Sequence, residues 1–196
     1  NKAVEWDVIA FNPMKKVKQL KLDKTPKVRY LDSSEEERLL CALRSRDQRK
    51  IEERDNANKW REQRKYGLLP QFSADSYWDY LTPLVLLCMN TGIRRGEAFD
   101  LTWENVDLKS KLITIIGASA KNSHTRHIPL SKQATACLEK WASLQRGTSG
   151  LIFKSPITGA RLNNVYKSWE SLKKSADIIN FRFHDLRHHF ASTLVM

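Results

Sequence analysis

Residues 76–97 read SYWDYLTPLVLLCMNTGIRRGE, and the change of pattern inside this stretch decides the fold. Four apolar residues recur there at the spacing of one helix face: Leu81, Leu84, Val85 and Cys88. That spacing predicts a buried helix over residues 76–90. Gly92 ends the helix, because glycine adopts the left-handed cap conformation without steric cost.

Two arginines follow the glycine turn directly. Arg94 and Arg95 stand at the predicted start of a second, short helix over residues 94–101, with Glu97 in its first turn. An arginine at this place can simply pair with Glu97 or with a neighbouring helix end. It can also bind a phosphate, because a guanidinium matches phosphate oxygens in a bidentate geometry. Taken alone, this stretch leaves both interpretations open.

Further elements are predicted on both sides of this stretch. Upstream, a helix covers residues 1–11, and another starts at Ser33 or Ser34, either of which can cap it while a glutamate reaches back. Downstream, we expect a hairpin over residues 111–116 and 126–130, helices over 131–147 and 163–176, a brief strand over 151–153 and a final helix that runs from 184 to the end. The predicted fold class is α+β, mainly α-helical, with a small β-hairpin.

Charge points to a polyanion as partner. The chain has 34 Lys and Arg against 22 Asp and Glu, a net charge of +12. Half of this excess lies in residues 14–29, whose basic residues are Lys15, Lys16, Lys18, Lys21, Lys24, Lys27 and Arg29. Residues 14–28 are therefore interpreted as a basic linker that follows a phosphate backbone, although a solvated linker without contacts would have the same composition. Residues 44–66, also rich in charge, predict a solvent-exposed helical excursion to which we assign no function.

Cysteine spacing and hydropathy indicate the compartment. Cys41, Cys88 and Cys137 show no CxxC spacing, which predicts reduced thiols in a cytoplasm and neither disulfides nor a zinc knuckle. The longest apolar run, residues 84–89, is far too short to cross a bilayer, and the first residues do not begin a signal peptide. Because no initiator methionine is present, we expect a segment of a longer protein.

A second motif lies near the end of the chain, where residues 183–191 read FHDLRHHFA. His184 and Arg187 are spaced to share a helix face with His188, while an apolar face buries the helix. His184 and His188 also have the spacing of a zinc pair. Arg187 would place a cation between such ligands, and the glutamate of an HExxH motif is missing, so we expect no metal and no other cofactor.

A third position, Lys121, lies at the predicted hairpin tip. By itself a lysine there is usually solvated. The order of the three motifs resembles the catalytic domain of tyrosine recombinases, the phage integrase family, which has TGxRxxE at a helix end, a hairpin lysine before an xxxPL strand end, and HxLRHxxA opening a helix. The resemblance covers residues 29–196 and implies the fold of that catalytic domain. Residues 1–13 resemble the last helix of the family's DNA-binding arm domain.

The resemblance implies site-specific DNA recombination or integration by phosphodiester transesterification, with no cofactor. Arg94 and Arg187 would clamp the non-bridging oxygens of the transition state. Lys121 would protonate the leaving 5′ hydroxyl, and His184 would hydrogen-bond the phosphate or handle the proton of the nucleophile.

Supporting roles follow from the same resemblance. Glu97 would orient an active-site cation, and His188 would support its helix or contact phosphate. Contacts to the DNA backbone are expected from Lys15, Lys16, Lys18, Lys21 and Arg95. The implied partners are double-stranded DNA and further protomers, as a tetramer on DNA in the intact protein, with no membrane.

The chain departs from the family pattern in its nucleophile. In the family a tyrosine follows the HxLRH helix by some tens of residues, after a further His or Trp, whereas this chain stops nine residues after Arg187. All five tyrosines precede His184, and none is predicted to attack DNA: Tyr30, Tyr66, Tyr77, Tyr80 and Tyr166. We therefore expect weak DNA binding and no covalent adduct from this chain alone, while a tyrosine from another protomer stays possible.

Three other functions compete with this interpretation. A recombinase-like module that binds DNA without cutting it would not need both arginines, the lysine and the histidine. A metal-dependent nuclease would suit the charge, but the sequence shows no cluster of acidic ligands. An RNA-binding or scaffold protein is less favoured, because no RNA-binding aromatic motif is visible. The DNA target and the choice among integration, excision and resolution cannot be derived from these residues.

Overall fold

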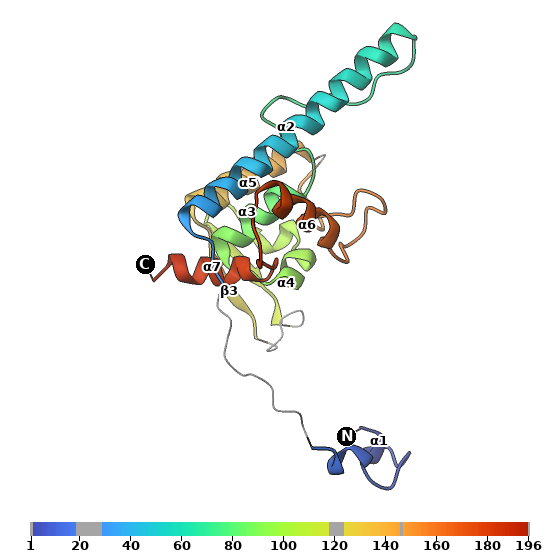
Figure 1. The fold of residues 1–196 in the computed structure, drawn as a ribbon, viewed down its shortest axis with the longest axis vertical. Coiled ribbons are helices and arrows are strands. Elements are labelled where there is room, and N and C mark those ends of the chain that lie inside the picture. Colours follow the sequence, from blue (N-terminus) through green and yellow to red (C-terminus); the bar gives the residue numbers. More distant parts are fainter. Residues whose placement is uncertain (1, 19–28, 118–123, 146, 196) are drawn as a thin grey trace.

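The computed structural model describes residues 2–18, 29–117, 124–145 and 147–195 of the chain. Within these ranges the chain is mainly helical, with one three-stranded antiparallel sheet (Figure 1), as predicted from the sequence. The helices are α1 (Lys2–Glu5), η1 (Pro13–Lys16), α2 (Ser33–Gln63), α3 (Leu81–Thr91), α4 (Arg95–Asp100), η2 (Trp103–Asn105), α5 (Lys132–Leu144), α6 (Tyr166–Ser175) and α7 (Asp185–Thr193).

Helix α3 forms the centre of the core, with nine of its eleven residues buried. Helices α5 and α7 both pack against α3, and α6 packs against α2 (Figure 1). The predicted helix over 76–90 begins only at Leu81, because the Asp79 carboxylate accepts a hydrogen bond from the Leu81 amide at 2.9 Å and so marks a turn before the helix. The buried helix that was predicted is thus confirmed, with a later start.

The sheet has the order β1–β2–β3, formed by Val106–Asp107, Leu112–Ile115 and Arg126–Pro129. Strands β2 and β3 pair Ile113 with Ile128, which confirms the predicted hairpin. Strand β1 was not predicted, because two residues carry no alternation pattern. The predicted strand over 151–153 is wrong: Leu151 makes a single isolated bridge to Thr102.

The residue that caps α2 is Asp32, which lies just before the two serines predicted as caps. The carboxylate of Asp32, and neither Ser33 nor Ser34, accepts the Glu35 amide at 2.8 Å, while the Glu35 carboxylate accepts the Asp32 amide at 3.2 Å. Asp32 has the extended backbone that a cap needs, so its side chain reaches the first free amides. A reciprocal capping box therefore fixes the start of α2.

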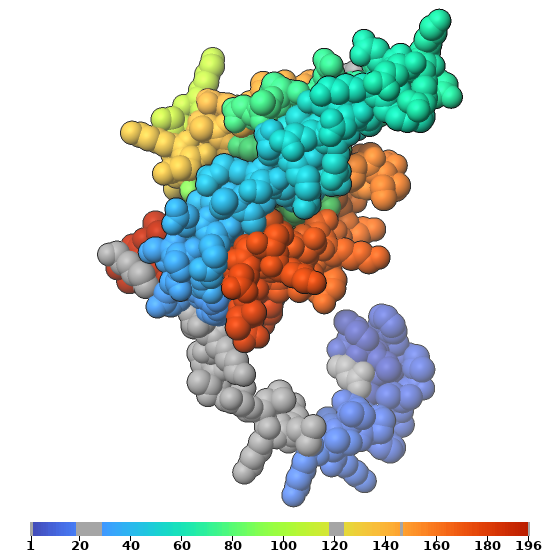
Figure 2. Space-filling model, turned by 45° about the horizontal axis from the view of Figure 1, so that its top comes forward, coloured from blue at the N-terminus to red at the C-terminus, as the bar shows by residue number. Residues whose placement is uncertain are grey.

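Beyond Leu43, α2 continues without a break as a projection from the rest of the fold (Figures 1 and 2). The returning chain is tied to it by Asn58, whose amide nitrogen donates to the Leu69 carbonyl at 2.9 Å and whose oxygen accepts the Leu69 amide at 2.8 Å. The Arg54 guanidinium lies over the rings of Phe72 and Trp78. We call residues 44–72 the arm. The predicted charged helix over 44–66 is present and ends at Gln63, but it is less exposed than predicted, because Asp47, Ile51 and Asn58 are buried.

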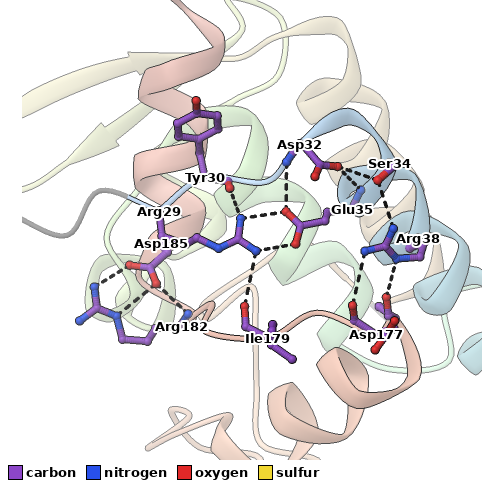
Figure 3. A network of polar contacts seen from close by, with 11 residues as sticks. Arg29, Tyr30, Asp32, Ser34, Glu35, Arg38, Asp177, Ile179, Arg182 and Asp185 are labelled. Atoms are coloured by element: carbon purple, nitrogen blue, oxygen red, sulfur yellow. Dashed lines mark hydrogen bonds and ion pairs between the residues drawn. The ribbon is translucent and has the colours of Figure 1, made fainter.

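A polar network joins the start of α2 to the segment that enters α7 (Figure 3). Arg29 pairs with Glu35 and also donates to the Ile179 carbonyl at 3.4 Å. Arg182 donates to the buried carboxylate of Asp185 at 2.8 Å, and the amide of Arg182 donates to the same carboxylate. These contacts fix the first turn of α7, which carries the second sequence motif.

Three predicted helix boundaries need correction. The helix expected over residues 1–11 ends at Glu5, and Asp7 adopts a positive φ of 55°, which no α-helix continues through. The helix expected to run from 184 to the end of the chain ends at Thr193. The helix over 131–147 keeps its predicted cap, Ser131, but ends at Leu144. Among the residues described, no helix is both long enough and apolar enough to cross a membrane.

Candidate phosphate-binding site

The turn between α3 and α4 is built on Gly92. This residue caps α3 with φ +60°, and a methyl group on it would overlap the ring of Phe190 in α7. Only glycine therefore allows both the left-handed turn and the close approach of α7. The first and second sequence motifs meet at this contact.

Glu97 lies at the centre of the site and is almost fully buried. Its carboxylate accepts the Arg94 amide and the Arg94 guanidinium, each at 2.9 Å. It also accepts two hydrogen bonds from the Arg126 guanidinium, at 2.9 and 2.6 Å. The predicted alternative for Arg94, a pair with Glu97, is thus present, yet one third of the Arg94 side chain stays exposed.

These contacts set the ionisation of Glu97. Burial by itself raises the pKa of this carboxyl, but hydrogen bonds from Arg126 and Arg94 outweigh burial and hold the pKa at about 2. Glu97 is therefore fully charged at neutral pH.

Arg187 lies beside the same turn. Its guanidinium donates to the carbonyl oxygen of Gly92, two residues before Arg94. Burial, followed by the positive charges of Arg94 and Arg126, lowers the pKa of Arg187, so Arg187 is close enough to feel both of these charges. We call Arg94, Arg126 and Arg187 around Glu97 the arginine cluster.

The histidines of α7 lie next to this cluster. The rings of His184 and His188 meet edge to face, with centroids 5.4 Å apart. Burial and then the charge of His188 lower the pKa of His184, which favours the neutral form at pH 7. A neutral imidazole can both donate and accept a hydrogen bond.

A hollow of about 460 Å³ opens beside Arg94 and His184. Its other walls come from the start of α4, from α6 and from the segment before α7, and its lining is Arg94, Arg95, Gly96, Val165, Tyr166, Trp169, Glu170, Arg182, Phe183 and His184. Three arginines and one glutamate line this hollow, so it suits an anion.

The remaining predicted residues are placed as follows. Lys121 and Lys21 lie outside the described residues. Lys15, Lys16 and Lys18 are exposed in and after η1. Arg95 is exposed, with its guanidinium 6.0 Å from the centre of the Phe99 ring.

Three residues of this region were not predicted from the sequence. Arg126 opens strand β3, and its partner Glu97 is far away in the sequence, so no local spacing revealed the pair. Arg182 and Tyr166 line the hollow, although neither belongs to a motif. The one indication that the sequence offered for Arg182 was its place two residues before His184.

Among the described residues, the other titratable groups give no indication of a second functional site. Cys41 is exposed, while Cys88 and Cys137 are buried, and all three are free thiols. Burial raises the pKa of Cys137 to about 11. In the described part of the chain, no group of three or more His, Cys, Asp or Glu side chains is arranged to hold a metal ion.

A mainly helical domain with a small antiparallel sheet, in which a TGxR turn meets an HxLR helix, defines the class of tyrosine recombinase catalytic domains. The phage integrase family matches residues 59–196, and the chain belongs to that family. The resemblance found in the sequence is thereby confirmed.

Individual relatives support the same assignment. The integrase of Salmonella phage P22 is 30% identical over 130 residues, which cover 62% of this chain and 34% of that protein. The shufflon-specific DNA recombinase of Escherichia coli is 25% identical over 189 residues, 96% of this chain and 38% of that protein. The chain thus spans little more than a third of the length of these relatives.

Solved structures share the fold. The XerA recombinase is 19% identical, with a TM-score of 0.58, over 99% of this chain and 58% of that one. The Tn1549 transposon integrase, in complex with a circular intermediate DNA, is 17% identical, with a TM-score of 0.63, over 99% of this chain and 62% of that one. At these identities the likeness shows the fold alone.

Proposed function

We propose that this chain provides the phosphate-binding part of a site-specific DNA recombinase, which breaks and rejoins DNA by transesterification. The observation that carries this proposal is the arginine cluster, which gathers cations from α4, β3 and α7 around one buried carboxylate. The related proteins are recombinases and integrases, and the Tn1549 integrase was solved with DNA. Double-stranded DNA is the proposed substrate.

The two arginines of the sequence motifs have the central role in this proposal. Attack on a phosphodiester builds negative charge on its non-bridging oxygens, and guanidiniums held beforehand stabilise that charge. Arg94 is partly exposed, with one guanidinium nitrogen on Glu97, and Arg187 is anchored at Gly92. Both side chains are therefore oriented before DNA arrives, which spares reorganisation in the transition state.

Proton transfers belong to other groups. We assign protonation of the leaving 5′ oxygen to Lys121 and a hydrogen bond to the phosphate, or the proton of the nucleophile, to His184. The lowered pKa of His184 suits a group that accepts a proton at neutral pH. Glu97 orients the arginines, and His188 supports its helix or contacts phosphate.

DNA outside the scissile phosphate would contact a basic surface. We assign these contacts to Lys15, Lys16, Lys18 and Lys21 of the linker, residues 14–28, and to Arg95 beside the hollow. In this proposal residues 1–13 end an arm domain, residues 29–196 form the catalytic domain, and several protomers assemble on DNA in the cytoplasm. The nucleophilic tyrosine comes from sequence beyond this chain or from another protomer.

Covalent trapping tests this function. The chain, alone and extended with the sequence that follows it in its gene, is incubated with a pool of randomised 40-bp duplexes that contain a nick, once with Mg²⁺ and once with chelator. We expect an SDS-resistant protein–DNA adduct through a 3′-phosphotyrosine only from the extended protein. DNA binding without any adduct would support the non-catalytic binding module, and cleavage that stops in chelator would support a metal-dependent nuclease.

A further inference from the structure

Arg126 belongs to no recombinase motif quoted above, yet it makes two hydrogen bonds to the buried carboxylate at the centre of the site. Its guanidinium grips both oxygens of Glu97, with Nη1 2.9 Å from Oε1 and Nη2 2.6 Å from Oε2. Arg94 donates to the same two oxygens, its Nη1 to Oε1 and its amide to Oε2. One carboxylate is therefore shared between a strand and a helix start.

This sharing limits how Glu97 can hold Arg94. A carboxylate and a guanidinium form two parallel hydrogen bonds when nothing else competes. Arg126 occupies that bidentate arrangement, so Glu97 binds the Arg94 side chain through Nη1 only. Among the described residues, the Arg94 guanidinium donates to no other carboxylate, and a third of its side chain is exposed.

The charge balance leads to the same conclusion. Arg94 and Glu97 alone would form a neutral pair, which attracts a phosphate weakly. With Arg126 and Arg187 the cluster has three guanidinium charges and one carboxylate charge, and the charges of Arg94 and Arg126 are felt at Arg187. Arg126 thus leaves a net positive charge where phosphate would bind.

Arg126 also connects the hairpin to the site. It is the first residue of β3, and beside it the Thr125 hydroxyl accepts the Gly117 amide at 3.0 Å, which closes the stem of the hairpin. The pair with Glu97 therefore joins the sheet to the first turn of α4.

We infer that Arg126 is a positioning residue, which holds Glu97 from the sheet side and thereby keeps the Arg94 guanidinium oriented for phosphate. This inference rests on the proposed function. It predicts that loss of Arg126 weakens stabilisation of the non-bridging oxygens and leaves the leaving-group side unaffected.

The test compares Arg126→Gln and Arg126→Lys in the extended protein on a duplex recovered by covalent trapping. We expect single-turnover cleavage to fall about 10- to 100-fold for Arg126→Gln, close to the loss of one preorganised donor, and less for Arg126→Lys. Arg46→Gln is the matched control, because Arg46 forms a similarly buried bidentate pair with Asp79 away from the site. It should lower thermal stability comparably and change the cleavage rate less than about twofold.

Two modified substrates separate positioning from general damage. A methylphosphonate at the scissile position lacks one non-bridging charge, so the Arg126→Gln defect should shrink there to roughly threefold or less. A bridging sulfur in place of the leaving oxygen removes the need for protonation, and the defect should persist at full size there. A defect that stays unchanged on the methylphosphonate, or that disappears on the sulfur substrate, overturns the inference.

Phosphate binding to the chain as given provides a readout without cleavage. Inorganic phosphate is titrated into the wild-type chain, Arg126→Gln, Arg94→Gln and Arg46→Gln. We expect both cluster variants to bind at least about fivefold more weakly and Arg46→Gln to bind like the wild type. Equal binding by Arg126→Gln and wild type overturns this inference alone. The proposed function is overturned if the wild-type chain binds no phosphate and the extended wild-type protein cuts no DNA.

Discussion

Arg187 donates a hydrogen bond to the carbonyl oxygen of Gly92, and this bond joins the helix of the second motif to the residue that ends α3. The two motifs are far apart in the sequence, and they meet because α7 packs along α3. Arg94 follows Gly92 by two residues, so the same junction sets the position of both proposed clamp residues.

Gly92→Ala is expected to lower the free energy of unfolding by about 2–4 kcal/mol, because it combines a left-handed backbone with overlap onto Phe190. Gly159→Ala is the matched control. Gly159 has φ +69° but nothing within 4 Å of an added methyl, so only the backbone cost of about 1 kcal/mol applies. Urea denaturation measures both. Equal losses in the two variants would show that the α3–α7 contact tolerates a methyl group.

Glu97 should make stability depend on acidity. Its folded pKa of about 2 lies below the ordinary 4.5, so the stability that it contributes is complete above pH 4.5 and is lost as the pH falls toward 2. Glu97→Gln removes this dependence and should also destabilise the fold at pH 7, since the arginines lose their counterion. Denaturation of both proteins between pH 7 and pH 3 measures the difference. The difference in free energy of unfolding between the two proteins should become smaller as the pH falls. A difference that stays constant over this range would contradict the ion pairs of Glu97 with the arginines.

Arg94→Lys and Arg187→Lys should each reduce cleavage by the extended protein at least about 100-fold, although the charge is kept. An ammonium is a point charge and cannot hold two oxygens in the fork geometry of a guanidinium. Single-turnover rates on trapped DNA measure the effect. Lys15→Gln, in the exposed linker, is the comparison: it should weaken DNA binding and reduce its salt dependence without changing the rate at saturation. Retention of the wild-type rate by either cluster variant would remove that arginine from the clamp.

Tyr166 allows a sharp test of the missing nucleophile, because it is the tyrosine among the described residues that lines the hollow beside Arg94. Its side chain is exposed and sits at the start of α6. Tyr166→Phe in the extended protein should form the covalent adduct as well as the wild type does. Peptide mapping of the adduct gives the attachment site directly. DNA attached to Tyr166 would contradict both the assignment and the need for sequence beyond this chain.

Asn58→Ala should release the segment of the arm that folds back on α2, since the amide and carbonyl of Leu69 would lose their partners. The expected cost is about 1–3 kcal/mol, confined to the arm. Hydrogen exchange should accelerate at residues 66–70, while α3 stays protected. Gln48→Ala, which removes an exposed contact to Glu52 on the same helix, should leave exchange unchanged. Uniform acceleration in α3 would show that the arm and core unfold together.

Much of this architecture could be predicted, because it depends on local patterns. The apolar spacing from Leu81 to Cys88, the glycine turn at Gly92 and the alternation in β2 and β3 each depend on neighbours in the sequence. The helix cap shows the limit of such patterns. Asp32, Ser33 and Ser34 are all good capping residues, and only the backbone conformation decided for Asp32.

Long-range pairing explains the remaining errors. Nothing near Arg126 indicates Glu97 as its partner, and nothing near Asn58 shows that the chain after the charged helix folds back on it. The strand expected at 151–153 failed for the same reason: Ile152 and Phe153 are fully inaccessible, but among the described residues the segment has only the isolated bridge from Leu151 to Thr102. A sequence pattern indicates which residues are buried, but it does not indicate which residues they pack against.

Phe190 has no polar group, yet its ring limits how closely α7 approaches the turn after α3. Because it rests on the bare backbone of Gly92, the thickness of an aromatic ring fixes the distance between the helix that carries Arg187 and the turn that carries Arg94. A smaller side chain at position 190 would let α7 and the turn approach, and would bring Arg187 and Arg94 closer together. A methyl group on residue 92 would push them apart. A hydrophobic contact, that of Phe190 with Gly92, thus sets the spacing of charged groups in the site.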